Sequence, residues 1–396
     1  MKNWYLKFSS QPHQPFFSSG MIFFIIFLTL LLGSFSSVFS LDSSLLTYHA
    51  YSMIFIVFVQ FFMGFLYVVF PRFLVQAEIK KELYMKHFFL YFFSSLGFLL
   101  SILFANNFIF IFTLFLILAQ ILSFRILYSI YENSKVANKY DTKWILISFL
   151  FGLISHIIYY FSLFGFSNSY FLEKIAINSG FYLFLFGLIF SISQRMIPFF
   201  TQVKVQTYKI NKSAKIMEIF FILMILKVVF LTLNLTIFSL IINIAFFIFI
   251  IFELYKWKLP LFNVSAIMWV LYISLYWIPI GFFISILQNS FELLNINFVF
   301  EKASLHTFAL GYFSTILLGF GTRVVLGHSG QTPHANKFTT IIFIVVQIIV
   351  LLRIFTSFSL NLHFNYIFWV NLTTAILLIS LVIWSLKYIK ILLKGK

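Results

Sequence analysis

Histidine is the residue type whose chemistry and placement stand out in this chain, because an ionisable side chain inside an apolar segment is costly to bury in lipid. The chain has eight histidines and no cysteine. Three of them, His49, His156 and His306, fall where long apolar segments approach one side of a membrane. Without thiolates, disulfides, Cys zinc sites and iron–sulfur clusters are excluded. Any metal must be bound by histidine, with Met, Tyr and carboxylate side chains as helpers.

Two interpretations of these histidines compete. Two imidazoles on facing helices can bind a haem iron from both sides, with His49 and His306 as the best candidates and His156 as a third ligand or a neighbour of the ligands. Alternatively, each histidine makes one hydrogen bond between helices, which is the ordinary role of a lone histidine in a membrane span. Three histidines at one depth in so apolar a chain favour a cofactor site.

Small and polar residues accompany these histidines at helical spacing. His49, Met53, Gln60 and Gly64 share one helix face together with Ile56, and that face is expected to point inward. His156 shares a face with Gly152 and Tyr159. The segment that begins near His306 carries a stripe of small residues, Ala303, Thr307, Gly311, Thr315 and Gly319. Such a stripe lets either a neighbouring helix or a flat ring approach the backbone, and the neighbouring helix is the more ordinary occupant.

The elements that must position these residues are membrane-spanning helices. With 62% hydrophobic and 9% charged residues, the chain needs lipid as its solvent. Each of the following stretches is long enough to cross a hydrocarbon layer of roughly 30 Å as a helix. The predicted spans are residues 21–39, 53–70, 88–104, 108–127, 144–164, 176–197, 216–233, 235–252, 262–287, 298–318, 338–355 and 366–389. The fold class is therefore an all-α polytopic helix bundle of about twelve spans, in a single membrane domain over residues 1–396.

The positive charges follow the topology of these spans. Most Lys and Arg residues fall in alternate loops, and the opposite loops are nearly free of them, with Lys174 and Lys302 as exceptions. This positive-inside pattern predicts that both termini lie on the cytoplasmic side. The expected location of this multi-pass protein is the bacterial inner membrane. It also explains the net charge of +17 without nucleic acid as a partner. The lipid bilayer is the expected partner, and the oligomeric state is left open.

Three spans share a further feature. The second, sixth and tenth predicted spans each run from outside to inside and end near an arginine, namely Arg72, Arg195 and Arg323. Arginine also marks cytoplasmic helix ends in general. The sharper hypothesis is a quasi-threefold arrangement of four-helix arcs in which these three spans line the interior.

Several motifs resemble the NnrS family of membrane proteins. Residues 12–17 (PHQPFF) resemble its R-P-F-F element, residues 48–53 (YHAYSM) its W-H-A-H-E-M element, and residues 195–201 (RMIPFFT) its G-R-V-I-P-x-F-T segment. Residues 305–311 (LHTFALG) followed by 322–330 (TRVVLGHSG) closely resemble L-H-A-L-T-x-G and M-T-R-x-x-L-G-H-T-G. The matching pieces span most of the chain, and the last pairing is specific in its spacing.

The resemblance implies haem, of b-type, and copper as cofactors, and a role in nitric oxide metabolism or nitrosative stress with NO as a gaseous ligand. The residues expected to support the ligands or to contact an anion such as a haem propionate are Tyr48, Tyr51, Met53, Arg195, Arg323, His328 and His13. For Gly327-His328-Ser329-Gly330, a tight turn between helices is an equal alternative. The chain departs from the family at Tyr51, Ser52 and Tyr272, where the family pattern has His, Glu and an expected His, so fewer metals or Tyr and Met ligands are expected.

Other functions are weighed against this one. Twelve helices with outer histidines also resemble haem-copper oxidases, but those enzymes need histidines on the sixth and seventh spans, which have none here. A secondary transporter would place its site near the midplane beside broken helices, and Lys227 and Pro279 could support it. An NO-reducing redox enzyme would need a docking site for its electron donor, which no motif indicates. Catalysis, sensing and metal delivery remain open.

Overall fold

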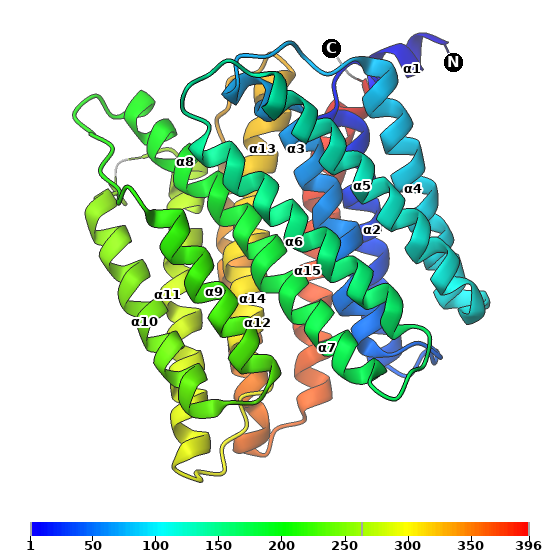
Figure 1. Cartoon of the computed structure of the whole chain (residues 1–396), viewed down its shortest axis with the longest axis vertical. Coiled ribbons are helices and arrows are strands. Elements are labelled where there is room, and N and C mark those ends of the chain that lie inside the picture. Colours follow the sequence, from blue (N-terminus) through cyan, green and yellow to red (C-terminus); the bar gives the residue numbers. More distant parts are fainter. Residues whose placement is uncertain (1, 263, 395–396) are drawn as a thin grey trace. The chain divides into compact units, whose positions relative to one another are not determined.

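The computed structural model describes residues 2–262 and 264–394, which form helices joined by short loops (Figure 1). No strand occurs in these two ranges. A chain surrounded by hydrocarbon must satisfy its backbone hydrogen bonds within itself, and long runs of Phe, Ile and Leu do so as helices. The predicted all-α polytopic bundle is confirmed.

Eleven of the helices formed by the described residues are long and apolar enough to cross a membrane. The remaining predicted span, residues 216–233, forms α9 (Ile216–Thr232) with 17 residues. At about 1.5 Å per residue, α9 is about 26 Å long, slightly less than a hydrocarbon layer of roughly 30 Å. The prediction of about twelve spans therefore differs from the structure by one short helix.

The chain forms two compact units. The first unit comprises the chain up to Ser191, the segment Gly327–Gln331 and the stretch from Leu381 onward. The second unit comprises Ile192–Leu326 and Thr332–Ser380. The sequence-based expectation of a single membrane domain stays a prediction.

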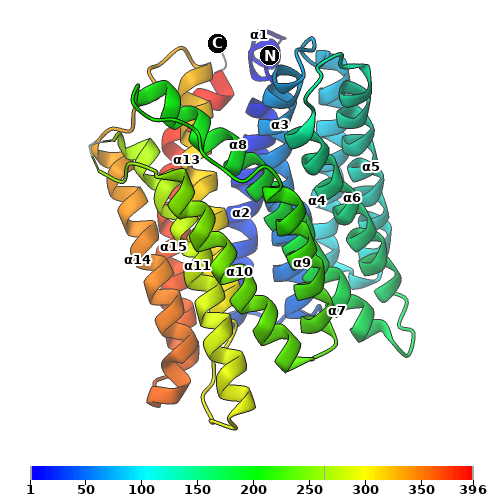
Figure 2. The same cartoon turned by 60° about the vertical axis from the view of Figure 1, so that its left-hand side comes forward.

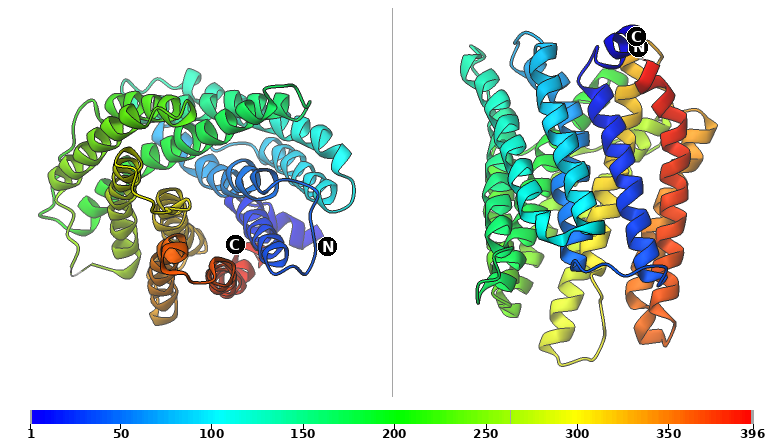
Figure 3. Two further views of the ribbon diagram at one scale, coloured as in Figure 1. Left: turned by 90° about the horizontal axis from the view of Figure 1, so that it is seen from below. Right: turned by 90° about the vertical axis from the view of Figure 1, so that its right-hand side faces the viewer.

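In the first unit, α2 packs against α3, α4 against α5, α5 against α6 and α6 against α7, each pair side by side (Figures 1 and 2). Its elements are α1 (Lys2–Phe8), α2 (His13–Phe35), the π-helical η1 (Leu46–Tyr51) and η2 (Met53–Val57), α3 (Phe58–Phe73), α4 (Lys81–Phe104), the 3₁₀ turn η3 (Asn106–Phe108), α5 (Ile109–Asn133), α6 (Tyr140–Ser162), α7 (Ser169–Ser179), the π-helical η4 (Gly180–Phe186) and the first turn of α8 (Gly187–Lys204). The last turns of α15 (Tyr366–Lys394) join this unit at the end where α2 begins, and Gln14 donates a hydrogen bond to the Leu392 carbonyl at 3.3 Å (Figure 3).

In the second unit, α9, α10 and α11 follow one another as antiparallel neighbours (Figure 2). Its remaining elements are α10 (Thr236–Trp257), α11 (Ala266–Leu293), α12 (Ala303–His306), the π-helical η5 (Thr307–Ser314), most of α13 (Thr315–His328), α14 (Lys337–Phe358) and the 3₁₀ turn η6 (Ser359–Leu362). The π-helical η5 packs against α11 and α14. Helix α11 continues through Pro279 without a break, although the transporter alternative expects a broken helix there.

The second, sixth and tenth predicted spans are the most deeply buried. The buried share of the most apolar stretch is 89% in Leu46–Phe73, 89% in Ser169–Lys204 and 83% in Ala303–His328. In the other eight spans this share is at most 67%. This burial agrees with the hypothesis that these three spans line the interior. The other spans expose Ile, Leu and Phe side chains, for example on α10 and α14, as helices that face lipid do.

Three helices extend beyond their predicted spans and thereby include histidines that the predicted boundaries leave outside. Helix α2 begins at His13, not near Met21, so His13 starts a buried helix instead of lying in a cytoplasmic tail. Helix α4 begins at Lys81, not at Phe88, which places His87 inside the span with no exposed surface. His328 is the last residue of α13, which extends beyond the predicted end of its span. In each case, polar residues continue the helix past the end of the apolar run, where hydropathy alone gives no signal.

Candidate functional site

The three most buried spans share a local irregularity. Each contains π-helical turns: η1 and η2 in the second span, η4 in the sixth, and η5 in the tenth. A π-helical turn adds a residue to the helix and is frequent at functional sites. In η2, the Phe55 carbonyl accepts a hydrogen bond from the Tyr91 hydroxyl of α4. Two of the three candidate ligands, His49 and His306, lie in or next to such turns.

His49 lies in η1 and is partly buried. The predicted face below it is buried at Ile56, Gln60 and Gly64, where Phe17 packs against the glycine. Because η1 and η2 interrupt the 3.6-residue period, the simple spacing that aligned His49 with Gln60 does not hold along this span. Gln60 is 1% exposed, and neither amide atom has a hydrogen-bond partner among the described residues.

The neighbours of His49 tie η1 to other helices. Tyr48 donates a hydrogen bond to the Ser34 hydroxyl of α2 at 3.2 Å. Met53, at the start of η2, is partly buried. Tyr51, which replaces a family histidine, has no exposed surface and lies between Phe98 and Tyr159. These residues therefore hold the π-helical segment against α2, α4 and α6.

His156 of α6 is the centre of a buried polar cluster. Its Nε2 lies 2.7 Å from the Tyr51 hydroxyl, and its Nδ1 lies 2.7 Å from the Gln120 side-chain oxygen of α5. The ring of Phe55 stacks on the imidazole with 4.4 Å between ring centroids. Of the two expectations for His156, third ligand or neighbour of the ligands, these contacts favour the second, because both ring nitrogens are engaged. Its role as a ligand stays a prediction.

His306 is the last residue of α12 and precedes η5 in the second unit. Its Nδ1 lies 3.1 Å from the Lys302 carbonyl. A carbonyl can only accept, so Nδ1 carries the proton and the lone pair lies on Nε2, which is the arrangement of a metal-binding imidazole. The convergence of His49 and His306 on one iron stays a prediction, since each belongs to a different unit.

The small-residue stripe of the tenth span is occupied by a neighbouring helix. A methyl group at Gly311 would lie 2.6 Å from the Trp277 ring of α11, and one at Gly319 would lie 2.8 Å from Leu271. The Trp277 indole donates to the Gln347 side-chain oxygen of α14 at 2.7 Å, which fixes the ring. Of the two occupants considered, a helix or a flat ring, the structure has the helix at these glycines.

At the end of the first unit where α2 begins, His13 and His328 meet. Their ring centroids lie 4.8 Å apart, and His13 is 4% exposed. The chain turns directly after His328, and Gly330 takes a left-handed conformation with φ of +79°. The tight-turn interpretation of this motif therefore holds for its backbone. The expected propionate contact of these two histidines stays a prediction.

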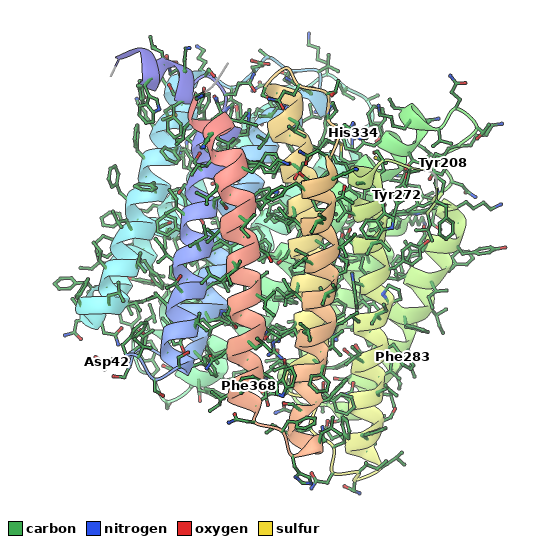
Figure 4. The ribbon with its side chains drawn as sticks, turned by 180° about the vertical axis from the view of Figure 1, so that it is seen from behind. Asp42, Tyr208, Tyr272, Phe283, His334 and Phe368 are labelled. Carbon is green, nitrogen blue, oxygen red and sulfur yellow. The ribbon has the colours of Figure 1, made fainter. Side chains whose placement is uncertain are left out.

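The two arginines expected to contact an anion lie in the second unit. Arg323 of α13 places its guanidinium 3.8 Å from the centroid of the Phe200 ring, and both it and Arg195 of α8 are partly buried. Tyr272, where the resemblance leads us to expect a histidine, exchanges a hydrogen bond of 2.8 Å with Thr201. Tyr208 lies near Tyr272 (Figure 4), and burial raises the pKa of the Tyr208 hydroxyl to about 12.

Sequence reasoning missed two groups of buried polar residues. Gln120 and Thr113 of α5 complete the cluster around His156, and both have no exposed surface. His87 forms a second cluster, with its Nδ1 2.9 Å from the Tyr67 hydroxyl and its Nε2 2.8 Å from the Ser123 hydroxyl. A glutamine in an otherwise apolar span is itself a signal, because an amide in lipid needs a partner. Within residues 2–262 and 264–394, no three His, Asp or Glu residues are grouped to hold a metal ion.

Comparison with known families covers nearly the whole chain. Residues 7–396 match the family described as NnrS protein. A search among curated proteins finds no match. The family match includes the segments around His49, Arg195 and His306 that suggested the resemblance. By this match the chain belongs to the NnrS family.

Proposed function

We propose that this multi-pass membrane protein binds a b-type haem through His49 and His306 and acts in the handling of nitric oxide or in the response to nitrosative stress. The observation that carries the proposal is the placement of both histidines at π-helical turns of deeply buried spans, in a chain that matches the NnrS family over residues 7–396. Its expected location is the bacterial inner membrane, with both termini in the cytoplasm.

The donor set fits a haem. Imidazole nitrogens are common axial ligands, and the Lys302 carbonyl orients the His306 ring with its lone pair on Nε2. The absence of cysteine excludes the thioether attachment of c-type haem, so the haem would be held without covalent bonds. When bound, its iron would supply the site at which NO coordinates. Arg195, Arg323, His13 and His328 are proposed contacts for the propionates.

Copper is proposed at a lower stoichiometry than in relatives that keep the family histidines. Tyr51 is bound to His156 and Tyr272 to Thr201, so both phenol oxygens already have protein partners. A neutral phenol is also a weaker copper ligand than imidazole. Metal analysis of the purified protein tests this expectation.

The test of the haem assignment is the absorption spectrum of protein purified in mild detergent. A Soret band is expected, and it should shift or disappear in both His49→Ala and His306→Ala. His363→Ala is the matched control, because His363 lies in an exposed loop after η6 and should leave the band unchanged. A colourless parent protein, or a band that survives in the double variant, contradicts the assignment.

The transporter alternative is supported by one observation. The buried Lys227 of α9 donates to the Asn243 side-chain oxygen of α10 at 2.7 Å, and Asn243 donates to Asn289 of α11 at 2.8 Å. A transporter should be colourless and should move solute in liposomes. An NO-reducing enzyme would instead consume NO in liposomes supplied with an electron donor.

A further inference from the structure

The first unit contains a polar cavity of about 680 Å³ at the end where the loop after α2 meets α7. Two of the ten acidic residues of the chain, Asp42 and Glu173, line it, together with the amides of Asn106 and Asn107. Among the described residues, no Lys or Arg lines it. Figure 4 shows Asp42 at one end of the helices of this unit. A cavity of this size with many polar partners holds water.

A hydroxyl of this cavity contacts the buried interior. Thr47 lines the cavity and is 7% exposed. Its hydroxyl accepts a hydrogen bond from the Tyr159 hydroxyl at 3.0 Å and lies 3.1 Å from that of Ser44, which in turn lies 3.5 Å from a Glu173 oxygen. A series of hydrogen-bonding groups therefore leads from the acidic wall to Tyr159 of α6.

Tyr159 leads on to the His156 cluster. Its ring stacks on that of Tyr51 with 4.3 Å between centroids and 27° between planes. The Tyr51 hydroxyl then lies 2.7 Å from His156 Nε2. Both tyrosines and the histidine have no exposed surface. The two stacked phenol rings of Tyr159 and Tyr51 therefore lie between Thr47 of the cavity and the His156 imidazole.

The cluster around His156 has more hydrogen-bonding atoms than it can satisfy. Since Nδ1 faces the Gln120 oxygen at 2.7 Å, Nδ1 carries the proton and Tyr51 donates to Nε2. The Gln120 amide nitrogen is then left without an acceptor in the described part of the first unit. Reversing the amide would leave its oxygen without a donor instead. The Thr113 hydroxyl, beside Tyr51, likewise makes no hydrogen bond of normal geometry within the described residues.

We propose that Tyr51, Thr113, Gln120 and His156 form a buried water site that exchanges water and protons with the aqueous phase through the acidic cavity, past Thr47 and Tyr159. Water would satisfy the Gln120 amide nitrogen, which has no acceptor among the described residues, and the Thr113 hydroxyl, whose contact with Tyr51 lacks normal hydrogen-bond geometry. The site needs no haem, so it stands or falls independently of the function proposed above.

The His87 cluster supplies a matched comparison inside the same unit. His87 is equally buried and is also bound to a tyrosine, but its nitrogens meet Tyr67, Ser123 and the Ala119 carbonyl. Neither His87 nor Ser123 has a side-chain atom left without a partner, and neither lines the cavity. Water access should therefore distinguish two histidines of equal burial.

In the first test, the whole protein in nanodiscs is kept in D₂O. Mass spectrometry then measures, for each histidine separately, the exchange of the imidazole C2 proton. His156 should exchange at least about tenfold faster than His87, since exchange from a closed site needs opening. Thr47→Val, which removes the hydroxyl and keeps the shape, should slow His156 and leave His87 unchanged. Equal rates for the two histidines in the parent protein, or a parallel change of both in the variant, overturns the proposal.

The second test uses cysteines, because the chain has none of its own. Asp42→Cys marks the side of the membrane on which the cavity opens. Silver ion, a probe of nearly the size of water, is added to that side, and protection against later maleimide labelling of the denatured protein is measured. Thr113→Cys should be protected, whereas Ser123→Cys, at an equally buried position of the same helix, should not. Protection of both thiols or of neither overturns the proposal.

Discussion

At the residue scale, the Tyr51–His156 pair is the clearest feature of the first unit. A buried imidazole keeps its position only if both nitrogens have partners, and here a phenol and an amide provide them. The resemblance to the NnrS motif leads us to expect a second histidine where this chain has Tyr51. If the resemblance holds at this position, Tyr51 serves as a hydrogen-bond donor to His156 where a metal ligand is expected.

Tyr51→Phe should destabilise the protein. The substitution removes the O–H donor and leaves Nε2 of His156 buried without a partner, which costs about 1–3 kcal/mol. A lower temperature of unfolding in detergent is expected, while Tyr255→Phe should change little because Tyr255 is 76% exposed on α10. Equal unfolding temperatures for the parent and Tyr51→Phe would contradict this account of the pair.

At the element scale, the helices of the first unit approach closely where a glycine allows it. A methyl group at Gly152 of α6 would lie 2.7 Å from the Gln120 amide nitrogen and 2.7 Å from the Phe184 ring of η4. Gly152 thus lets α5 and η4 pack against the same face of α6. The distance of the Gln120 amide from His156 depends on this contact.

Gly152→Ala should therefore cost about 1–3 kcal/mol of stability, the usual effect of overpacking a tight contact. It should also displace Gln120 from His156. The matched control is Gly327→Ala, since a methyl group at Gly327 meets no atom of the described residues within 4 Å. Chemical unfolding of the two variants in detergent checks the difference, and a Gly152 variant as stable as the Gly327 variant would refute the packing argument.

In the second unit, the hydrogen bonds from Lys227 to Asn243 and from Asn243 to Asn289 connect α9, α10 and α11. Asn243→Leu should destabilise the protein by about 1–3 kcal/mol, because it removes the acceptor of a buried ammonium group. Adding Lys227→Met should recover part of this loss, since an apolar pair of similar shape needs no partner. A double variant less stable than Asn243→Leu would show that Lys227 has a more important role than joining helices.

The sequence predicts the helices of this chain well and their irregularities poorly. The positions of the spans follow from hydropathy, whereas the starts at His13 and Lys81 lie in polar stretches without a hydropathy signal. The π-helical turns depend on tertiary contacts such as that of Tyr91 with the Phe55 carbonyl, which no local pattern encodes. For the same reason the sequence identified His156 and Tyr51 as important but could not pair them, or join them to Gln120.

At the scale of the whole molecule, the positive-inside pattern predicts that both termini lie in the cytoplasm. Reporter proteins fused at either end should therefore be active only if they function in the cytoplasm. A fusion within the loop of Asp42 should behave in the opposite way. Termini on opposite sides of the membrane would require an odd number of spans and would contradict the twelve-span topology in which α9 crosses the membrane.

The central claim is that His49 and His306 bind one haem iron together. Electron paramagnetic resonance of the ferric protein, with haem quantified, tests it most directly, because two imidazole ligands give a low-spin iron. The account predicts a low-spin signal in the parent that becomes high-spin, or is lost with the haem, in each single alanine variant. A low-spin signal that persists in either variant, or a parent protein that takes up no haem, would contradict it.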